Sequence, residues 1–311
     1  MSGFKVLQPG MLSLIQDAGR FGCHGIGLTT GGPIDSLAFR WANRLLGNAL
    51  DATAVEVSIG GLELEATLNS RICVTGAELP LRINGEAVDL WQSHMVRAGD
   101  IIALGYVTSG ARAYIAVAGG FNMAAQFGST ATVTRESLGG LDGKPLQQGD
   151  ELACESVVDG ECLRLPESYR PDYSGDVVVR VVPGYQQSYF SARQQARFFA
   201  GEYTVSDRCD RMGYRLEGPV IECEINGILS EGICYGAIQI PADGQPIVLL
   251  NDRQTIGGYP KIGSAFSLDA ARLAQMSAGG KVQFEAIDPF SAHNELRLAE
   301  SRFQRTHAEP C

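Results

Sequence analysis

The chain has 311 residues, of which 45% are hydrophobic and 19% are charged, so it can build a substantial core in one large domain or two of ordinary size. Its net charge of −10 makes a nucleic-acid-binding surface a poor prediction. No apolar run approaches the roughly 20 residues that span a bilayer, and the N-terminal stretch MSGFKVLQPG lacks the apolar segment of a signal peptide. We therefore expect a cytoplasmic protein that binds neither nucleic acid nor a membrane.

The first clear element is a helix over Ser36–Leu46. Asp35 stands at its N-cap position, and Gly47 follows its last turn. The apolar residues between them, Trp41 among them, recur at helical spacing and form one face. This pattern predicts an amphipathic helix that packs on a core.

Strand patterns follow, from Glu56 to Gly120. Short β-branched runs alternate there with turn residues. The Asn84-Gly85 step between two such runs is a strong hairpin signal. We predict a meander of short antiparallel strands in this segment, and the stretches GDVVVRVVPG and GKVQFEAIDP show the same pattern in the second half.

The middle of the chain holds two segments without periodicity. Residues 122–149 form a long connection rich in glycine and threonine, and loops of that length are usually functional or mobile. Residues 165–175 contain two prolines and polar residues, which is typical of a boundary. We therefore predict an N-terminal β-rich lobe over 1–165, a C-terminal β-barrel lobe over 175–290, and a helix and tail over 291–311.

Helices are few in the second half. We predict one over Ser188–Ala200, one over Ser267–Ala278, and one that begins at Asp288-Pro289, where a cap precedes a proline. The last residues, RTHAEPC, are expected to be frayed. Many short strands and few helices indicate a mainly β fold, a barrel or a sandwich.

The eight cysteines carry no CxxC motif and no paired ligand spacing, so no metal site is predicted. Without a signal peptide, most are expected to be reduced thiols, several of them buried. Cys23 and His24 are adjacent, but adjacency says little about a catalytic pair. The functional status of Cys23 and Cys209 is left open.

Several common catalytic motifs are absent from the sequence. There is no phosphate-binding G-x-x-x-x-G-K-[ST] loop, no G-x-G-x-x-G that joins a strand to a helix, and no G-x-S-x-G nucleophile elbow. The chemistry must therefore come from other polar residues.

Three polar clusters remain as candidates. Two lie in SLIQDAGRFGCHGIGLTTGGPID and VSDRCDRMGYRLEGP, and the third is GQPIVLLNDRQTIGGYPKIG. In the third, an apolar strand ends in charged residues, which must pair or meet solvent or a ligand. In the second, arginine side chains suit a carboxylate.

A structural interpretation competes with the functional one in each cluster. A surface ion pair contributes roughly 0–1 kcal/mol and carries no chemistry, and the second cluster suits a charge network that closes a barrel end. For the first two clusters both interpretations stay open. We favour a functional site in the third, because the glycines beyond its charged residues keep the surface open.

These clusters carry a family resemblance. The motifs QDAGRFG, GGPIDSLAFRWANRLLGN, AYIAVAGGF, GGLDGKPLQQGD, DRMGYRLEGP and GAIQIPADGQPIVLLNDRQTIGGYPKIG run in order over nearly the whole chain. They resemble the family of the 5-oxoprolinase C subunit, also called KipA or allophanate hydrolase subunit 2 and described as biotin-dependent carboxyltransferase-like. The resemblance implies cyclophilin-like β-barrel units in two lobes.

The resemblance also implies partners. Members work with a KipI-like protein, which is the B component of 5-oxoprolinase, and with a LamB/YcsF-like protein, which is its A component. The complex uses ATP to open 5-oxo-L-proline to L-glutamate, so we expect a hydrolase that acts on a cyclic amide and is active only in a complex. Since this chain lacks a known phosphate-binding motif, the ATP site is expected in a partner or shared with one.

Two other functions stay open. The chain is alternatively the carboxyltransferase component of a biotin-dependent carboxylase that acts on urea or another amide. It would not carry biotin itself, because none of its four lysines lies in a Met-Lys-Met setting. The second alternative is a regulatory protein that binds and antagonises a KipI-like partner. The true substrate, the stoichiometry of the complex and the activity of the isolated chain are not determined by the sequence.

Since the implied reaction acts on an amide bond, we expect the polar residues of these motifs to activate that bond or bind its substrate. Lys261, Arg253 and Arg211 are expected to stabilise an oxyanion or bind a substrate carboxylate, and Asp252 is expected to orient an arginine or act as a base. These four are the expected catalytic residues. The expected substrate-binding residues are Gln16, Asp17, Arg20, Tyr214, Arg215, Gln239, Gln245, Gln254, Thr255, Gly257, Gly258 and Tyr259.

Overall fold

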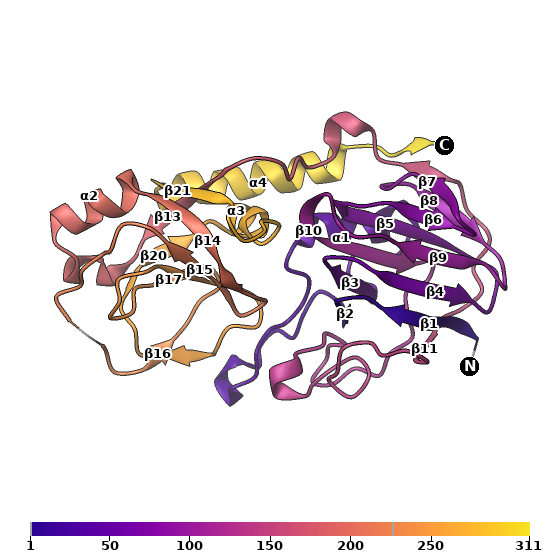
Figure 1. Cartoon of the computed structure of the whole chain (residues 1–311), viewed down its shortest axis with the longest axis horizontal. Helices are drawn as coiled ribbons and strands as arrows, with labels where there is room; N and C mark the ends of the chain where they lie inside the picture. Colours follow the sequence, from indigo (N-terminus) through magenta and orange to yellow (C-terminus); the bar gives the residue numbers. More distant parts are fainter. Residues whose placement is uncertain (1, 226) are drawn as a thin grey trace. The chain divides into compact units, whose positions relative to one another are not determined.

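The computed structural model describes residues 2–225 and 227–311, and these fold into two compact units (Figure 1). Unit 1 comprises the chain up to Cys23, Thr30–Tyr173 and Thr306–Cys311. Unit 2 comprises His24–Thr29 and Ser174–Arg305. The lobes expected over 1–165, 175–290 and 291–311 stay a prediction, because a compact unit need not coincide with a domain.

Unit 1 is built on two antiparallel sheets. The first has the strand order β11-β1-β4-β9-β6-β7 and the second the order β2-β3-β10-β5-β8. The strands of the first sheet, in that order, are Glu151–Ala153, Gly3–Pro9, Leu62–Ala66, Ile101–Leu104, Leu81–Ile83 and Glu86–Val88. Those of the second are Leu12–Gln16, Ala54–Ser58, Ser109–Val117, Ser70–Glu78 and Ser93–Val96.

The strands between Glu56 and Gly120 are antiparallel, as predicted, but they do not form a meander. Within this segment only β6 and β7 are both consecutive and paired. The others pair across the sequence, because the chain passes between the two sheets and buries a face of each. The β6–β7 turn is confirmed as a two-residue hairpin, with φ of 53° at Asn84 and 83° at Gly85.

The predicted helix of unit 1 is confirmed as α1, Ser36–Leu45. The Asp35 carboxylate accepts a hydrogen bond from the Ala38 N–H at 3.1 Å, which satisfies one of the free amides of the first turn. Trp41 and Leu45 are buried on its inner face. The capping residue and the apolar spacing therefore predicted the helix to within one residue of its end.

Unit 2 is a closed barrel of seven strands in the order β13-β20-β17-β18-β15-β14-β21. In that order the strands are Val177–Pro183, Lys261–Ala265, Ala237–Gln239, Ile247–Leu249, Gly213–Glu217, Glu202–Cys209 and Lys281–Ala286. Closure leaves the barrel strands without free edges. Together with the two sheets of unit 1, the barrel confirms the mainly β fold.

Three α-helices accompany the barrel in the described residues: α2, Ala192–Ala200, α3, Ser267–Leu273, and α4, Pro289–Arg305. The helix predicted from Ser188 begins later, because Ser191 caps α2 by accepting from the Gln194 N–H, and residues 185–189 form a separate 3-10 turn. The α4 start is confirmed, with the Asp288 carboxylate accepting from the N–H groups of Phe290 and Ser291. Further 3-10 turns are His24–Ile26, Thr134–Glu136 and Glu167–Tyr169.

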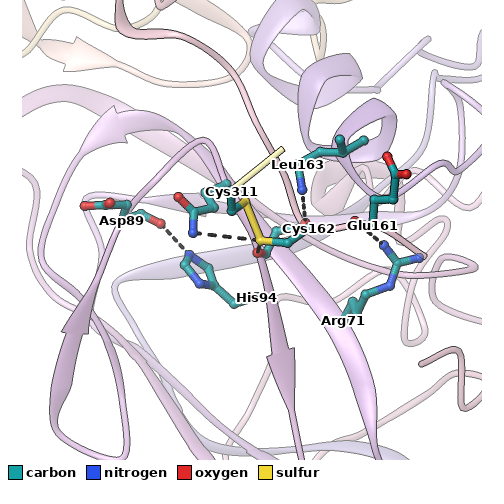
Figure 2. The surroundings of a disulfide bond; sticks show 9 residues. Arg71, Asp89, His94, Glu161, Cys162, Leu163 and Cys311 are labelled. Atoms are coloured by element: carbon teal, nitrogen blue, oxygen red, sulfur yellow. Dashed lines mark hydrogen bonds between the residues drawn. A yellow bond between two sulfur atoms is a disulfide. The ribbon is translucent and has the colours of Figure 1, made fainter. Parts of the chain in front are cut away.

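The C-terminal tail is ordered, so the prediction of a frayed end is wrong. β22, Glu309–Pro310, pairs with β12, Leu163–Arg164. A disulfide joins Cys162 to Cys311 beside this pair (Figure 2). Backbone pairing and a covalent bond hold the tail, and the sequence showed neither.

The six other cysteines are free thiols, as expected for most of them. Cys73 and Cys154 are buried, and burial raises the pKa of both thiols, for Cys154 to about 11. Within the described residues, none of the helices has the length and apolar character needed to cross a membrane.

Candidate active site

Lys261 is the first residue of β20 in the unit 2 barrel. It lies opposite Gln239 of β17 in the strand register. Its side chain is 11% exposed, and a lysine ammonium this far from water requires a partner. The partner is Glu231, which lies outside the barrel strands.

One carboxylate oxygen of Glu231 accepts three hydrogen bonds. Oε1 accepts from the Lys261 ammonium, from the Tyr185 hydroxyl and, at 2.8 Å, from the Gln186 side-chain amide. The amide oxygen of Gln186 in turn accepts from the Lys261 backbone N–H at 2.8 Å. We call Lys261, Glu231, Tyr185 and Gln186 the Lys261 cluster.

Contacts within the Lys261 cluster shift the pKa values of Glu231 and Tyr185. The Lys261 ammonium, and after it the Tyr185 hydroxyl, lower the pKa of Glu231. The bond to Glu231 raises the pKa of the Tyr185 hydroxyl. Both shifts keep Glu231 anionic and Tyr185 protonated at neutral pH.

Glu231 is held by a two-stranded ribbon. β16, Glu231–Gly232, pairs with β19, Ile256–Gly257, and Glu231 lies opposite Gly257. The backbone bonds from Ile228 N to Gly258 O, at 2.9 Å, and from Ile233 N to Thr255 O, at 3.0 Å, extend the pairing. The ribbon is therefore the structure that the polar end of GQPIVLLNDRQTIGGYPKIG forms.

The two glycines of this motif sit where space is short. A Cβ on Gly257 would lie 2.5 Å from Ile233 Cδ1 and 2.9 Å from the Gln239 amide nitrogen. A Cβ on Gly258 would lie 3.2 Å from the Ile228 carbonyl oxygen. The double glycine thus lets the ribbon approach the buried Gln239 closely. Around it, Gln254 and Tyr259 are exposed, and Thr255 is half-buried.

Arg253 is buried close to this ribbon, 6% exposed. Its guanidinium donates to the carbonyl oxygens of Ile233 and Leu250, both at 3.2 Å. Burial lowers the pKa of this guanidinium, and Cys234 and Tyr235 partly oppose the shift. Arg253 therefore ties the end of β18 to the segment that carries Glu231.

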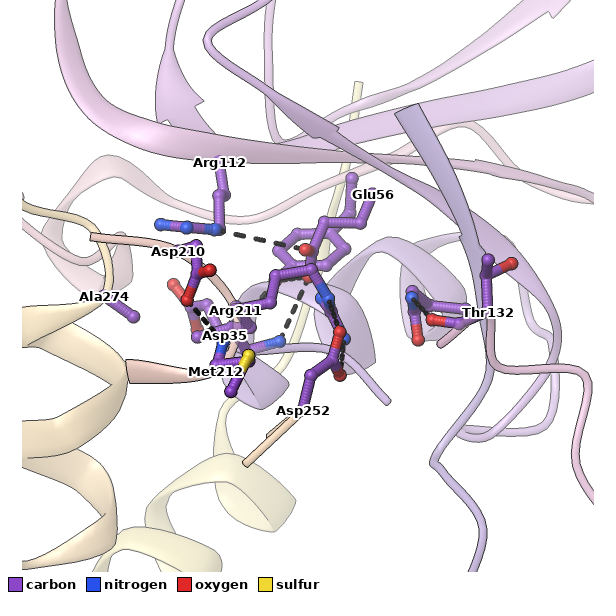
Figure 3. A network of polar contacts seen from close by, with 12 residues as sticks. Asp35, Glu56, Arg112, Thr132, Asp210, Arg211, Met212, Asp252 and Ala274 are labelled. Carbon is purple, nitrogen blue, oxygen red and sulfur yellow. Dashed lines mark hydrogen bonds and ion pairs between the residues drawn. The ribbon is translucent and has the colours of Figure 1, made fainter. Parts of the chain in front are cut away.

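Arg211 and Asp252 form a fork-to-fork pair (Figure 3). Arg211 Nε donates to Oδ2 at 2.9 Å, and Nη2 donates to Oδ1 at 3.0 Å. Both residues are 5% exposed. This geometry is the strongest that a guanidinium and a carboxylate adopt. It holds Asp252, which follows the apolar strand, in a fixed position.

Three of the expected substrate-binding residues make their contacts elsewhere in unit 2. The Tyr214 hydroxyl donates to the carbonyl oxygens of Ala274 and Met276. Arg215 pairs with Asp243. The Gln245 side chain bonds both the N–H and the carbonyl of Gly218. None of these contacts involves the Lys261 cluster.

Gln16, Asp17 and Arg20 of unit 1, which we call the loop clamp, hold the segment 126–132. Gln16 donates to the Thr132 carbonyl at 3.1 Å, and the Asp17 carboxylate accepts from the Ser129 hydroxyl at 2.5 Å. Further bonds join Asp17 with Thr130 N at 2.7 Å, and Arg20 with Gln126 O at 3.0 Å and with Ala131 O at 3.2 Å. The loop clamp organises the long Gly- and Thr-rich connection.

Unit 1 also buries a carboxylate that sequence reasoning missed. Glu56 Oε2 accepts from the Tyr114 hydroxyl at 2.8 Å and from the Ile34 N–H at 3.1 Å. Arg112 lies 4.0 Å from its other oxygen (Figure 3). Burial, and then Glu56, raise the pKa of Tyr114 well above its usual value.

Glu231, Tyr185 and Gln186 were likewise absent from the expected site. They lie 30 to 76 positions from Lys261 in the sequence, and no motif marks them. The one usable signal was general: a buried lysine needs an anion. Among the described residues, no three His, Cys, Asp or Glu side chains gather in a group able to hold a metal ion.

Comparison with known proteins identifies the family of this chain. The family model described as "Carboxyltransferase domain, subdomain A and B" matches residues 26–286. The chain is 36% identical over 294 residues to the C subunit of 5-oxoprolinase from Haemophilus influenzae, which covers 93% of this chain and 94% of the relative. It is 33% identical to the C subunit of 5-oxoprolinase from Escherichia coli, over 90% of each chain.

A solved structure agrees with the sequence comparison. The crystal structure of the Kluyveromyces lactis urea carboxylase has a TM-score of 0.92 and 26% identity over 98% of this chain. The chain spans only 29% of that protein, so the similarity concerns one part of a larger enzyme. The matched model and the long alignments together show that the chain belongs to the carboxyltransferase subdomain A and B family, among the C subunits of 5-oxoprolinases.

Proposed function

We propose that this chain is a subunit of an ATP-dependent 5-oxoprolinase, which opens 5-oxo-L-proline to L-glutamate. The observation that carries the proposal is the 36% identity to the C subunit of a 5-oxoprolinase over nearly the full length of both chains. The Lys261 cluster supports it, because a cation, a carboxylate and two neutral donors meet at one place in unit 2.

Lys261 is the centre of the proposed mechanism. Opening a lactam requires positive charge or donors where negative charge develops on the amide oxygen. The Lys261 ammonium and the Tyr185 hydroxyl are held side by side on Glu231 and meet this requirement. Gln186 fixes the geometry, since it bonds both the Glu231 carboxylate and the Lys261 backbone.

The other expected catalytic residues take supporting roles in this proposal. Arg211 and Asp252 neutralise each other in a buried pair, so we propose that they hold the end of β18 in place. Arg253 connects that end to the Glu231 segment through the Ile233 carbonyl. Gly257, Gly258 and Tyr259 lie in or next to the ribbon, and Gln239 lies close to it on barrel strand β17. We propose that these four residues line the substrate site.

The capped helices of the described chain offer no phosphate site. The N-terminal amides of α1, α2 and α4 are bonded by the chain's own side chains, Asp35, Ser191 and Asp288. An anionic phosphate competes poorly with the Asp35 and Asp288 carboxylates already placed at α1 and α4. We therefore propose that the ATP that drives ring opening binds in a partner or at a junction with one.

The proposed partners are a KipI-like protein and a LamB/YcsF-like protein, and the proposed location is cytoplasmic. Relatives that are named as subunits support assembly in a complex. The Cys162–Cys311 disulfide makes the location testable, because such bonds are rare in reducing compartments. Thiol labelling of the protein inside cells reports whether these two cysteines are free.

A second candidate function is carboxyl transfer in a biotin-dependent carboxylase. The structural match to a urea carboxylase favours it. In that case biotin would arrive on another protein, and Lys261 with its donors would bind the amide acceptor. The substrate assay separates the two candidates.

The test is glutamate release from 5-oxoproline and ATP by the co-expressed complex. We expect glutamate only when all three subunits are present. Lys261→Ala should lower kcat at least about 100-fold, the typical loss for one oxyanion donor. Lys281→Ala is the matched control, because Lys281 is an exposed lysine paired with Glu202.

Two results would count against this proposal. Retained activity in Lys261→Ala would remove the lysine from the mechanism. Absence of glutamate from a folded complex supplied with ATP would favour carboxyl transfer, and biotin dependence with urea would then be measured.

A further inference from the structure

Glu231 reaches the Lys261 cluster from outside the barrel, whereas Lys261 lies on a barrel strand and Tyr185 and Gln186 lie on the 3-10 turn that follows barrel strand β13. Lys261 begins barrel strand β20, and Gln186 is 4% exposed and bonded to the Lys261 backbone. Tyr185 precedes Gln186 directly and donates to the same carboxylate oxygen. These three donors therefore converge on one point, the Oε1 atom of Glu231.

The carboxylate comes from a less firmly held element. Glu231 lies on the β16–β19 ribbon, which forms its own two-stranded sheet outside the closed barrel. Its side chain is 33% exposed, against 11% for Lys261. Glycines stand at positions 227, 232, 257 and 258 of the two ribbon segments. A short ribbon with glycines at both ends adjusts its backbone at low cost.

We propose that Lys261, Tyr185 and Gln186 form a carboxylate-binding site, and that Glu231 fills this site until the carboxylate of a small acid displaces it. The inference rests on the proposed function for the identity of that acid, since 5-oxoproline carries one carboxylate beside its lactam. Within the enzyme, Glu231 then acts as an internal competitor that the substrate must replace.

The composition of the site selects the ligand class. One ammonium with a hydroxyl and an amide balances a single negative charge. A phosphate dianion usually recruits arginines or several backbone amides, and among the described residues neither joins these three donors on Glu231. A neutral amide without a carboxylate brings no full negative charge to balance the lysine in the ground state that a binding measurement reports. The site therefore fits a monocarboxylate.

The experiment measures direct binding to the full chain by isothermal titration calorimetry, with 5-oxoproline, acetate and 2-pyrrolidinone as probes. The last is the lactam without the carboxylate. We expect Glu231→Gln to bind 5-oxoproline and acetate roughly fivefold more tightly than the wild type, equivalent to about 1 kcal/mol for a partly exposed ion pair. Affinity for 2-pyrrolidinone should not change.

Three further variants strengthen the test. Lys261→Met should abolish the gain when combined with Glu231→Gln, because the charge that binds the acid is gone. Glu217→Gln serves as the matched control, since Glu217 is exposed on β15 and outside the Lys261 cluster. Glu231→Ala repeats the measurement without any side-chain amide, so the result does not depend on one variant.

Carboxylate affinity that is unchanged or weaker in both Glu231 variants would overturn the inference, and so would absence of carboxylate binding in those variants. This outcome is distinguishable from failure of the proposed function. If acetate binds more tightly to Glu231→Gln while the full complex releases no glutamate, the carboxylate site stands and 5-oxoproline is not its natural ligand.

Discussion

The loop clamp of unit 1 and the Lys261 cluster of unit 2 look alike in the sequence but differ in their partners. In each, polar side chains stand close to a strand and to glycines. The loop clamp bonds mostly to backbone groups of segment 126–132, and Gln16 and Arg20 are fully buried. The Lys261 cluster joins side chains to one another, and its carboxylate is one-third exposed.

The difference separates structural from exchangeable contacts. When a side chain that bonds buried backbone groups is removed, those groups lose their hydrogen-bond partner, which costs about 1–3 kcal/mol for each group. A partly exposed carboxylate that bonds other side chains can be replaced by water or by a ligand at little cost. We therefore propose that the loop clamp serves stability and that the Lys261 cluster serves binding.

The largest effect on stability should come from the buried pair in unit 2. Asp252→Ala removes the carboxylate that accepts two hydrogen bonds from the buried Arg211 guanidinium, and breaking a buried pair typically costs about 3–5 kcal/mol. Native-state hydrogen exchange across the unit 2 peptides measures the loss. Asp207→Ala is the matched control, because Asp207 is exposed on β14. A loss below about 1 kcal/mol would contradict the assignment of this pair to stability.

The loop clamp should give the next largest effect. Asp17→Ala removes the acceptor for Ser129, Thr130 and Gly19, and we expect unit 1 to lose about 3 kcal/mol. Both tryptophans of the chain lie in unit 1, so tryptophan fluorescence during urea unfolding reports on this unit. Asp51→Ala, at an exposed turn position, should unfold like the wild type. If the two variants unfold alike, the loop clamp does not stabilise unit 1.

The smallest effect should come from Lys261. Lys261→Met removes a partly exposed pair, so unit 2 should lose no more than about 1 kcal/mol at pH 7. Lys261 lowers the pKa of Glu231, and such a carboxylate stabilises the fold above its unfolded pKa of about 4.3. That contribution disappears as the pH falls through the lower folded-state pKa.

Hydrogen exchange of unit 2 at several pH values tests this expectation. The difference between the wild type and Lys261→Met should be present at neutral pH and vanish below about pH 4. If Lys261→Met lost as much stability as Asp252→Ala, Lys261 would be a structural residue. The contrast between the loop clamp and the Lys261 cluster would then not hold.

Local features were predictable because they depend on neighbouring residues. The Asp35 cap, the Asn84-Gly85 hairpin and the Asp288-Pro289 helix start all appear as expected. The strand order was not predictable, because each sheet of unit 1 combines strands from distant parts of the chain. The prediction of a frayed tail was wrong for the same reason, because β22 pairs with residues about 146 positions away.

The candidate site shows the same limit. Lys261 and its glycines are visible in the motif YPKIG and the double glycine before it. Arg215, Tyr214 and Gln245 look equally suitable in sequence, yet their side chains bond residues outside the Lys261 cluster. Since polar side chains serve structure and binding alike, the motif could not separate them.

By itself, the sequence determined the mainly β fold, the capped helices and the family to which the chain belongs, because propensities, caps and long motifs are written in contiguous residues. Only the tertiary structure decided which of the 35 acidic residues faces Lys261. It also decided that Arg211 neutralises Asp252 and that the tail joins Cys162. The physical reason is that charge pairing depends on distance in space, and the chain brings these partners together only when the barrel and the sheets close.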